Sequence, residues 1–313
     1  MTGGLPKMIV VLGPTATGKS DLAVDIAISL QKAQRSKKPV CEIISADSRQ
    51  IYTGLDIGSG KITKKEMRGI PHHGLDILSP KSKQMFTASK FQDYAYAKAD
   101  EIIARGNIPI LCGGTGFYIQ AVVDGIILPD VPVNPELRKR LRKLTIEQMQ
   151  AQLRKLDPKR YEEIDRQNPV RLIRSIEIAT ALGNVPPVEI RKRYNTLLIG
   201  LDTDDKTLKG KISKRIEARL RKGMIGEAKR LHEEGLSWKR MREFGLEYGL
   251  LADLLQKKIT KEQFVERLGF DIGNYVRRQR AWFKRMEGII WFDAKKKDKN
   301  AKAFRCARTF LAK

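Results

Sequence analysis

The sequence has few cysteines and few histidines. Its 313 residues include only three of each, and Cys41, Cys112 and Cys306 show no paired metal-ligand spacing. An odd, unpaired set of this kind argues against a disulfide framework and against a zinc site. Because Cys41 and Cys112 fall in apolar runs, we expect both to be small core residues in a protein of the reducing cytoplasm.

Long hydrophobic runs are also missing. No stretch of about 18 apolar residues occurs, although a membrane-spanning helix requires one. The first residues, MTGGLPKMIVVLGP, become polar too soon for a secretory signal peptide. Both absences predict a cytoplasmic protein with no membrane segment.

Acidic residues are scarce relative to basic ones. The chain has 61 Lys and Arg against 36 Asp and Glu, a net charge of +25, while its hydrophobic content of 41% is ordinary. A charge so far from zero favours a polyanionic partner, with nucleic acid ahead of an acidic membrane surface. The length allows one large domain or two ordinary ones.

Apolar runs alternate with helical patterns over much of the chain, which predicts a parallel sheet with helices on both faces. Leu22, Ile26 and Leu30 recur at helical spacing after the first run, and a second helical pattern covers residues 89–106. The expected strands are residues 8–12, 41–47, 108–114, 197–202 and 288–294.

The middle of the chain differs, because residues 134–187 are basic and helical in pattern without a strand signal. We interpret this segment as a helical insertion in the α/β domain. The predicted domains are therefore 1–125, the first part of the core; 126–195, the insertion; and 196–313, the rest of the core with basic helices from Thr207 on. We expect the lysine-rich tail after the final strand to be a solvated basic end.

A phosphate-binding pattern, G-x-x-x-x-G-K-[ST], lies between the first expected strand and the first expected helix. In such a loop, backbone N–H groups and the helix N-terminus point at an anion, a lysine adds a positive charge, and a hydroxyl can bind Mg²⁺. Here Lys19 and Ser20 take those two places, with Ser20 as the candidate metal ligand. The predicted phosphate-binding residues are Gly13, Pro14, Thr15, Ala16, Thr17, Gly18, Lys19 and Ser20.

Two more polar stretches end strands at the same edge of the predicted sheet, where ligands of such folds bind. Asp47 could be a metal ligand, a general base or a helix cap, and Thr115 in CGGTGFY could contact an anion or cap a helix. The sequence does not show the other features expected of a protein that hydrolyses nucleotides. These are an apolar strand ending in an Asp that pairs with a second nucleotide motif, an adenine-specific lid and a guanine-reading motif. The residues therefore indicate a diphosphate-binding α/β enzyme with a large basic helical surface.

Taken together, the motifs resemble those of the bacterial tRNA dimethylallyltransferases, also called tRNA isopentenyltransferases, over nearly the whole chain. No Cys/His cluster follows the last motif, unlike in the eukaryotic members. The motifs that carry the resemblance are GPTATGKS, ISADSRQIYTGLDIGSGK, PHHGLDIL, CGGTGFY, NPVRLIRSIEI, KISKRIEARLRKGMIGEA and RRQRAWF.

The resemblance implies a fold like that of P-loop kinases, with an inserted all-helical domain. It implies transfer of a dimethylallyl group from dimethylallyl diphosphate to N6 of the adenosine just 3′ of the anticodon. The loop would then hold a leaving diphosphate, with Mg²⁺ near Ser20. Asp47 matches the base on N6, Thr115 a contact of the leaving diphosphate, and Arg215 the arginine across the channel.

The resemblance also implies a tRNA anticodon stem-loop as partner, with the target adenine flipped out of its stack. No protein partner is implied, and a monomer is expected. The residues that match the family's tRNA contacts are Asp47, Ser48, Arg49, Gln50, Gln167, Asn168, Pro169, Val170, Arg171, Arg174 and Gln279.

Several positions depart from the family's usual residues, but the residues proposed to carry the chemistry are unchanged. They are Gly60, Ile62, Gly74, Leu75, Glu247, Gly249 and Ala281. Three alternatives stay open: an adenylate isopentenyltransferase acting on free nucleotides, a P-loop kinase or ATPase acting on RNA, and a non-catalytic RNA-binding module. The net charge disfavours the first of these, and an intact phosphate loop with Asp47 and Thr115 disfavours the last.

Overall fold

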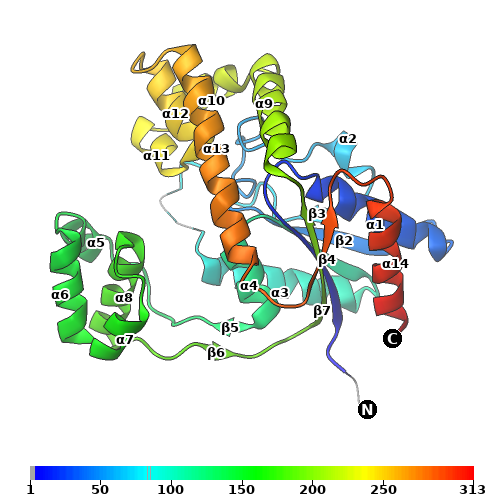
Figure 1. Ribbon diagram of the computed structural model, residues 1–313, viewed down its shortest axis with the longest axis horizontal. Coiled ribbons are helices and arrows are strands. Elements are labelled where there is room, and N and C mark those ends of the chain that lie inside the picture. The colour runs from blue at the N-terminus through cyan, green and yellow to red at the C-terminus, as the bar shows by residue number, and fades with distance from the viewer. Residues whose placement is uncertain (1–3, 83, 85) are drawn as a thin grey trace. The chain divides into compact units, whose positions relative to one another are not determined.

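A six-stranded, wholly parallel sheet lies at the centre of the larger of two compact units (Figure 1). The computed structural model describes residues 4–82, 84 and 86–313. The larger unit comprises residues 1–125 and 192–313, and the smaller one residues 126–191. The strands, in the order β3-β2-β4-β1-β7-β8, are β1 (Lys7–Leu12), β2 (Cys41–Ala46), β3 (His72–His73), β4 (Ile108–Gly113), β7 (Asn195–Asp202) and β8 (Ile289–Asp293).

The inner strands are apolar because both faces of the sheet are covered by helices. Helices α1 (Lys19–Ala33) and α14 (Lys299–Ala312) cover one face, and α3 (Ala88–Ala104) and α4 (Gly116–Asp124) cover the other (Figure 1). Cys41 and Cys112 are buried in the first of these cores, as predicted. The predicted parallel α/β sheet is confirmed, and its five expected strands lie within two residues of their observed bounds.

Three central strands end in register at the same edge of the sheet. Leu12 is paired with Gly113, and Gly113 with Ala46. The segments that follow these strands are therefore neighbours in space although they lie far apart in the sequence. This edge carries the candidate site.

Five helices lie between β7 and β8 in the sequence and enclose a core of their own in the larger unit. Residues Ile51, Tyr52 and Leu55, which follow β2, pack into the same core and tie it to the sheet edge. The helices are α9 (Asp205–Arg221), α10 (Met224–Glu233), α11 (Trp238–Glu243), α12 (Leu246–Leu255) and α13 (Lys261–Phe283), and a short α2 (Lys64–Met67) precedes β3.

The prediction of a solvated basic tail is wrong. Residues 299–312 form α14, in which Ala303 and Ala307 are completely buried against α1 and the sheet. The Lys7 ammonium also donates a hydrogen bond of 3.0 Å to the Leu311 carbonyl. The sequence misled because the many charged residues conceal a stripe of small and aromatic side chains at helical spacing.

The smaller unit is helical, as predicted, with one addition. Residues Ile126–Ile127 (β5) and Glu189–Ile190 (β6) form a short antiparallel pair that closes the insertion. Buried Glu177 accepts hydrogen bonds from Arg138, Arg174 and the Asn134 amide inside this unit. The helices are α5 (Pro135–Leu141), α6 (Ile146–Leu156), α7 (Pro158–Glu163) and α8 (Pro169–Leu182).

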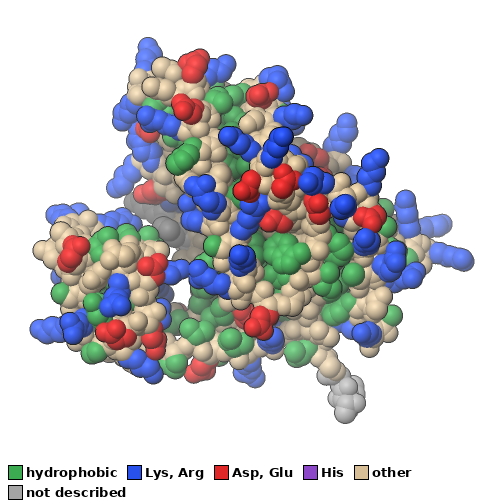
Figure 2. Space-filling view, in the orientation of Figure 1, with side chains coloured by type: hydrophobic (Ala, Val, Ile, Leu, Met, Phe, Trp, Pro, Cys, Tyr) green, Lys and Arg blue, Asp and Glu red, His purple; other side chains and the backbone are tan. Residues whose placement is uncertain are grey.

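Basic side chains are frequent on the visible faces of both units. Figure 2 shows Lys and Arg spread over these faces with Asp and Glu among them, rather than gathered in one patch. Within residues 4–82, 84 and 86–313, no helix is long and apolar enough to cross a membrane.

Candidate active site

The phosphate loop, residues 13–20, has the backbone conformation that its glycines permit. Gly13 has φ +141° and lies so close to the Leu201 carbonyl that a side chain there would collide with it. Gly18 has φ +94° and begins α1. Because a helix N-terminus presents unpaired N–H groups, the loop offers donors that an anion could accept at the start of α1.

Lys19 is half-buried in this loop. Its ammonium donates a hydrogen bond of 2.6 Å to the Pro14 carbonyl, which also accepts from the Thr17 hydroxyl at 2.9 Å. Burial lowers the pKa of Lys19 to about 8, and the charge of Arg215 lowers it further. The ammonium is therefore charged at neutral pH but poorly solvated, and a bound anion would stabilise that charge.

Gln279 of α13 joins the phosphate loop to the loop after β4. Its Oε1 accepts from the Thr15 amide at 2.9 Å, and its Nε2 donates to the Gly114 carbonyl at 2.8 Å. Only 4% of its surface is exposed. The amide holds two glycine-rich loops at a fixed separation, whereas the predicted contact between Gln279 and tRNA stays a prediction.

We expect Gln279→Leu to weaken pyrophosphate binding. The substitution keeps the size of the side chain but leaves the Thr15 amide and the Gly114 carbonyl without partners, and each buried unpaired group costs about 1–3 kcal/mol. Titration calorimetry with inorganic pyrophosphate should show affinity reduced by roughly tenfold or more, since about 1.4 kcal/mol corresponds to tenfold. Unchanged affinity in the variant would show that the loops do not need this clamp.

Asp47 and Thr115 lie together at the ends of β2 and β4. One carboxylate oxygen of Asp47 accepts from the backbone amides of Arg49 at 2.8 Å and Gln50 at 3.4 Å, while the Thr115 hydroxyl accepts from the Ser48 amide at 3.2 Å. The other Asp47 oxygen accepts no hydrogen bond from the described part of the chain. The carboxylate is thus oriented through one oxygen and has the other available for a ligand.

Two arginines of α9 line the cavity, and one of them, Arg215, contacts the phosphate loop. Arg215 donates to the Thr15 hydroxyl at 3.2 Å, and Arg219 donates to the Gly58 carbonyl at 3.0 Å and to Glu247 at 2.8 Å. Burial lowers the pKa of Arg215 to about 10, and the charge of Arg219 adds to this effect. Arg215 therefore still carries its positive charge at neutral pH.

A cavity of about 120 Å³ lies between these groups in the larger unit. Charged and polar side chains of the two loops and α9 form one part of its wall, and aliphatic side chains with Tyr275 form another. Burial raises the pKa of the Tyr275 phenol to about 12, so it stays neutral. The lining residues are Thr15, Ala16, Asp47, Ser48, Arg49, Ser59, Ile212, Arg215, Ile216, Arg219, Leu246, Glu247, Ile272 and Tyr275.

The sequence predicted some of the residues that line this cavity and missed others. Asp47, Arg215 and the phosphate loop are brought together as predicted, but Arg219, Glu247 and Tyr275 were not singled out as site residues. The spacing of Arg219, four residues after Arg215, was the available signal, because residues four apart share a helix face.

Two of the positions that depart from the family pattern meet at Arg219. Glu247 forms an ion pair with it, and a side chain on Gly60 would collide with the guanidinium groups of Arg219 and Arg215. The absence of a side chain at Gly60 therefore makes room for these two cations. These departures affect the wall of the cavity opposite the phosphate loop.

The remaining predicted tRNA contacts lie in both units. In the larger unit, the Gln50 side chain donates to the Gly60 carbonyl at 3.4 Å. In the smaller one, Asn168 caps α8, Val170 is 74% exposed and Arg171 lies 3.4 Å from Asp165. Together with Gln167 and Pro169, these three form the N-terminal region of α8.

Arg174 of α8 is hydrogen-bonded within the smaller unit and is less exposed than the first residues of this helix. Its guanidinium donates to Glu177 at 2.6 Å and to the Val131 carbonyl at 3.0 Å, and its side chain is 35% exposed. Both hydrogen bonds come from Nη1, so one of its three guanidinium nitrogens is used within the smaller unit. Its predicted contact with tRNA stays a prediction.

The phosphate loop could hold a magnesium ion through one side-chain oxygen, with most of the other ligands supplied by the phosphates of a bound molecule. The Ser20 hydroxyl lies in the first turn of α1, next to Lys19. Among the described residues, no group of three or more His, Cys, Asp or Glu could hold a metal ion. Mg²⁺ at phosphate sites takes few protein ligands and several from phosphate and water, so a single hydroxyl fits such a site.

Comparison with known proteins decides the family. The model of the IPP transferase family matches residues 50–286. The chain belongs to the IPP transferase family. It is 37% identical to tRNA dimethylallyltransferase 1 of Syntrophus aciditrophicus, over 92% of this chain and 94% of that protein. It is 34% identical to the tRNA dimethylallyltransferase of Acetivibrio thermocellus, over 98% of both chains.

Solved structures of IPP transferases share the fold. The tRNA isopentenylpyrophosphate transferase of Bacillus halodurans is 32% identical and superimposes with a TM-score of 0.70, covering 98% of this chain and 95% of that one. A eukaryotic dimethylallyltransferase that acts on tRNA has a TM-score of 0.79 at 23% identity, covering 98% of this chain and 80% of that one, and this likeness concerns the fold alone. The predicted family and the predicted fold class are thereby confirmed.

Proposed function

We propose that the protein transfers the dimethylallyl group of dimethylallyl diphosphate to N6 of the adenosine 3′-adjacent to the anticodon of tRNA, with release of diphosphate. The observation that carries this proposal is one cavity whose wall includes Thr15 and Ala16 of the phosphate loop, Arg215 and Asp47. Membership of the IPP transferase family, whose relatives carry this activity in their names, supports the same reaction.

The phosphate loop stabilises the leaving group. Negative charge grows on the diphosphate as its bond to C1 of the prenyl group breaks, and preorganised donors stabilise that charge without reorganising. Loop amides and Lys19 contact the diphosphate from one side, and Thr115 and Arg215 from the other. The planar guanidinium of Arg215 can bind two phosphate oxygens at once, which an ammonium cannot do with the same geometry.

Asp47 acts as the general base on the nucleophile. The N6 amine of adenine is a weak nucleophile because its lone pair is delocalised into the ring. As the bond from N6 to C1 forms, the C1–O bond electrons leave with the diphosphate and the extra N6 proton passes to Asp47. The hydrogen bonds from the Arg49 and Gln50 amides hold one carboxylate oxygen, so the other receives the proton.

Mg²⁺ at Ser20 would supply additional positive charge to the diphosphate oxygens. Ser20 is the protein ligand in this proposal, and phosphate oxygens and water complete the set. Lys19 and Arg215 share the neutralisation of the diphosphate with the ion.

The tRNA is held by basic and polar residues outside the cavity. A net charge of +25 supports strong, salt-dependent attraction to the RNA backbone. Ser48, Arg49 and Gln50 lie beside Asp47, where a flipped adenine must enter. Residues 167–171 and Arg174 of the smaller unit are the other proposed contacts.

A labelling assay tests this function. Purified protein is incubated with labelled dimethylallyl diphosphate and either unmodified tRNA, AMP or ATP. Label in tRNA is the expected result. Label in AMP would instead identify an adenylate isopentenyltransferase, and ATP consumption without prenyl transfer would identify a kinase or ATPase.

We expect pyrophosphate binding to weaken as pH rises above about 8, because free Lys19 has its pKa lowered to about 8 by burial. Below that pH the ammonium is protonated before the ligand arrives, whereas above it a proton must be taken up on binding. Calorimetric affinities from pH 7 to 9.5 should therefore fall more steeply for the native protein than for Lys19→Arg. The ligand's own titration is common to both proteins, so identical profiles would contradict this role for Lys19.

A further inference from the structure

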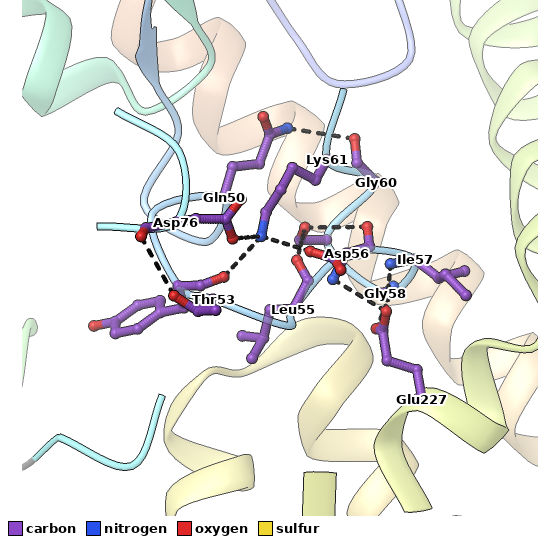
Figure 3. Close-up of polar contacts among 12 residues, drawn as sticks. Gln50, Thr53, Leu55, Asp56, Ile57, Gly58, Gly60, Lys61, Asp76 and Glu227 are labelled. Atoms are coloured by element: carbon purple, nitrogen blue, oxygen red, sulfur yellow. Dashed lines mark hydrogen bonds and ion pairs between the residues drawn. The ribbon is translucent and has the colours of Figure 1, made fainter. Parts of the chain in front are cut away.

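The 56–60 loop, which follows the second strand by ten residues, is fixed from beneath by one buried carboxylate. Glu227 of α10 is 2% exposed, and its carboxylate accepts from the amides of Asp56 at 3.1 Å, Ile57 at 2.7 Å and Gly58 at 3.0 Å. The Tyr248 hydroxyl donates a fourth hydrogen bond, of 2.7 Å. Figure 3 shows this carboxylate pointing to the backbone of the loop.

A second buried charge holds the same loop from another side. The Lys61 ammonium, with its side chain 6% exposed, forms ion pairs with Asp56 and Asp76 and donates to the Tyr52 carbonyl (Figure 3). A buried charge is costly unless its hydrogen-bonding groups are paired. Because the loop supplies partners to both charges, it is held in a single conformation.

The opposite side of the 56–60 loop borders the cavity. The Gly58 carbonyl accepts from Arg219, and Gly60 packs so closely against Arg215 and Arg219 that it has no room for a side chain. Ser59, between them, lines the cavity. The position of this loop therefore determines where the two guanidinium groups lie.

We propose that Glu227 is a positioning residue for the leaving diphosphate. It does not touch the cavity, and it acts through the 56–60 loop on Arg219 and Arg215. This inference rests on the proposed function, because that function assigns Arg215 to the diphosphate, and Arg219 lines the same cavity four residues further along α9. Glu227 was not a candidate from the sequence, since a glutamate in a helix with several other charged residues indicates an exposed charge.

The first test is the substitution Glu227→Gln. The shape is kept, but the Gln amide nitrogen meets backbone N–H groups that are themselves donors, so the loop loses hydrogen bonds. We expect titration calorimetry to show inorganic pyrophosphate binding weakened about tenfold or more, and the KM for the prenyl donor raised more than kcat is lowered. Tyr248→Phe, which removes only one hydrogen bond to Glu227, should shift both in the same direction by less.

Glu42→Gln is the matched control. Glu42 is an equally buried carboxylate, 5% exposed, with hydrogen bonds from His73, Arg105 and Asn107. It lies at the start of β2, whereas the site lies past the end of that strand. Its variant should lower the melting temperature without changing pyrophosphate affinity.

A double-mutant cycle separates positioning from general destabilisation. If Glu227 acts through Arg219, then Glu227→Gln should weaken pyrophosphate binding much less in an Arg219→Ala background, because residues in one network are not additive. Additive effects would overturn the proposal, as would unchanged affinity in both Glu227→Gln and Tyr248→Phe. If native protein failed to bind pyrophosphate at all, the proposed function itself would fall with it.

Discussion

The variant Asp47→Asn is expected to lose nearly all prenyl transfer while it still binds tRNA. Asn keeps the size of the side chain and an oxygen for the Arg49 and Gln50 amides, but it cannot take a proton from N6. Loss of a positioned general base lowers a rate by about 10²–10⁴-fold. Single-turnover transfer to tRNA under saturating donor measures the chemical step, and filter binding measures the affinity for tRNA.

Asp93→Asn is a suitable control for this experiment. It makes the same chemical change at an exposed position of α3, outside the cavity. Transfer by the control should equal that of the native protein. If tRNA affinity fell as far as the rate in Asp47→Asn, Asp47 would be a contact residue and not a base.

The variant Arg215→Ala is expected to lower kcat/KM for the prenyl donor by about 10²–10³-fold, the usual cost of removing one preorganised donor at a developing charge. Its half-buried guanidinium lies beside the phosphate loop and donates to the Thr15 hydroxyl at 3.2 Å. Arg215→Lys should recover only part of the loss, because an ammonium keeps the charge without the planar pair of donors. Initial rates at limiting donor and saturating tRNA give the measurement.

Arg221→Ala provides the comparison on the same helix. That side chain is 73% exposed and only approaches Glu217 at 3.9 Å, so its removal should leave kcat/KM for the donor unchanged. Equal effects of the two alanine variants would show that general charge, and not the position of Arg215, governs donor binding.

The sheet and the phosphate side of the site could be predicted from local sequence. Short apolar runs between glycines specify buried parallel strands, and the order of such strands brings the segments after β1, β2 and β4 to one edge. Asp47 follows β2 directly, and Thr115 lies two residues after β4. Their proximity to the phosphate loop therefore follows from the strand order, which the sequence pattern predicts.

The opposite wall could not be predicted in this way. Arg219, Glu247 and Tyr275 reach the cavity only through the packing of α9, α12 and α13, and no local pattern records that packing. Glu227 bonds to a loop about 170 residues earlier in the chain. The same limitation explains why α14 was wrongly predicted to be a solvated tail. Its many charged residues obscured the buried stripe around Ala303 and Ala307.

A crystal structure of the protein with a non-reactive prenyl diphosphate and an anticodon stem-loop tests the central claim most directly. The account predicts the diphosphate on the amides of the phosphate loop, between Lys19 and Arg215, with N6 of an extruded adenine within hydrogen-bonding distance of the Asp47 carboxylate. A diphosphate bound elsewhere, or an Asp47 carboxylate turned away from the extruded base, would contradict it.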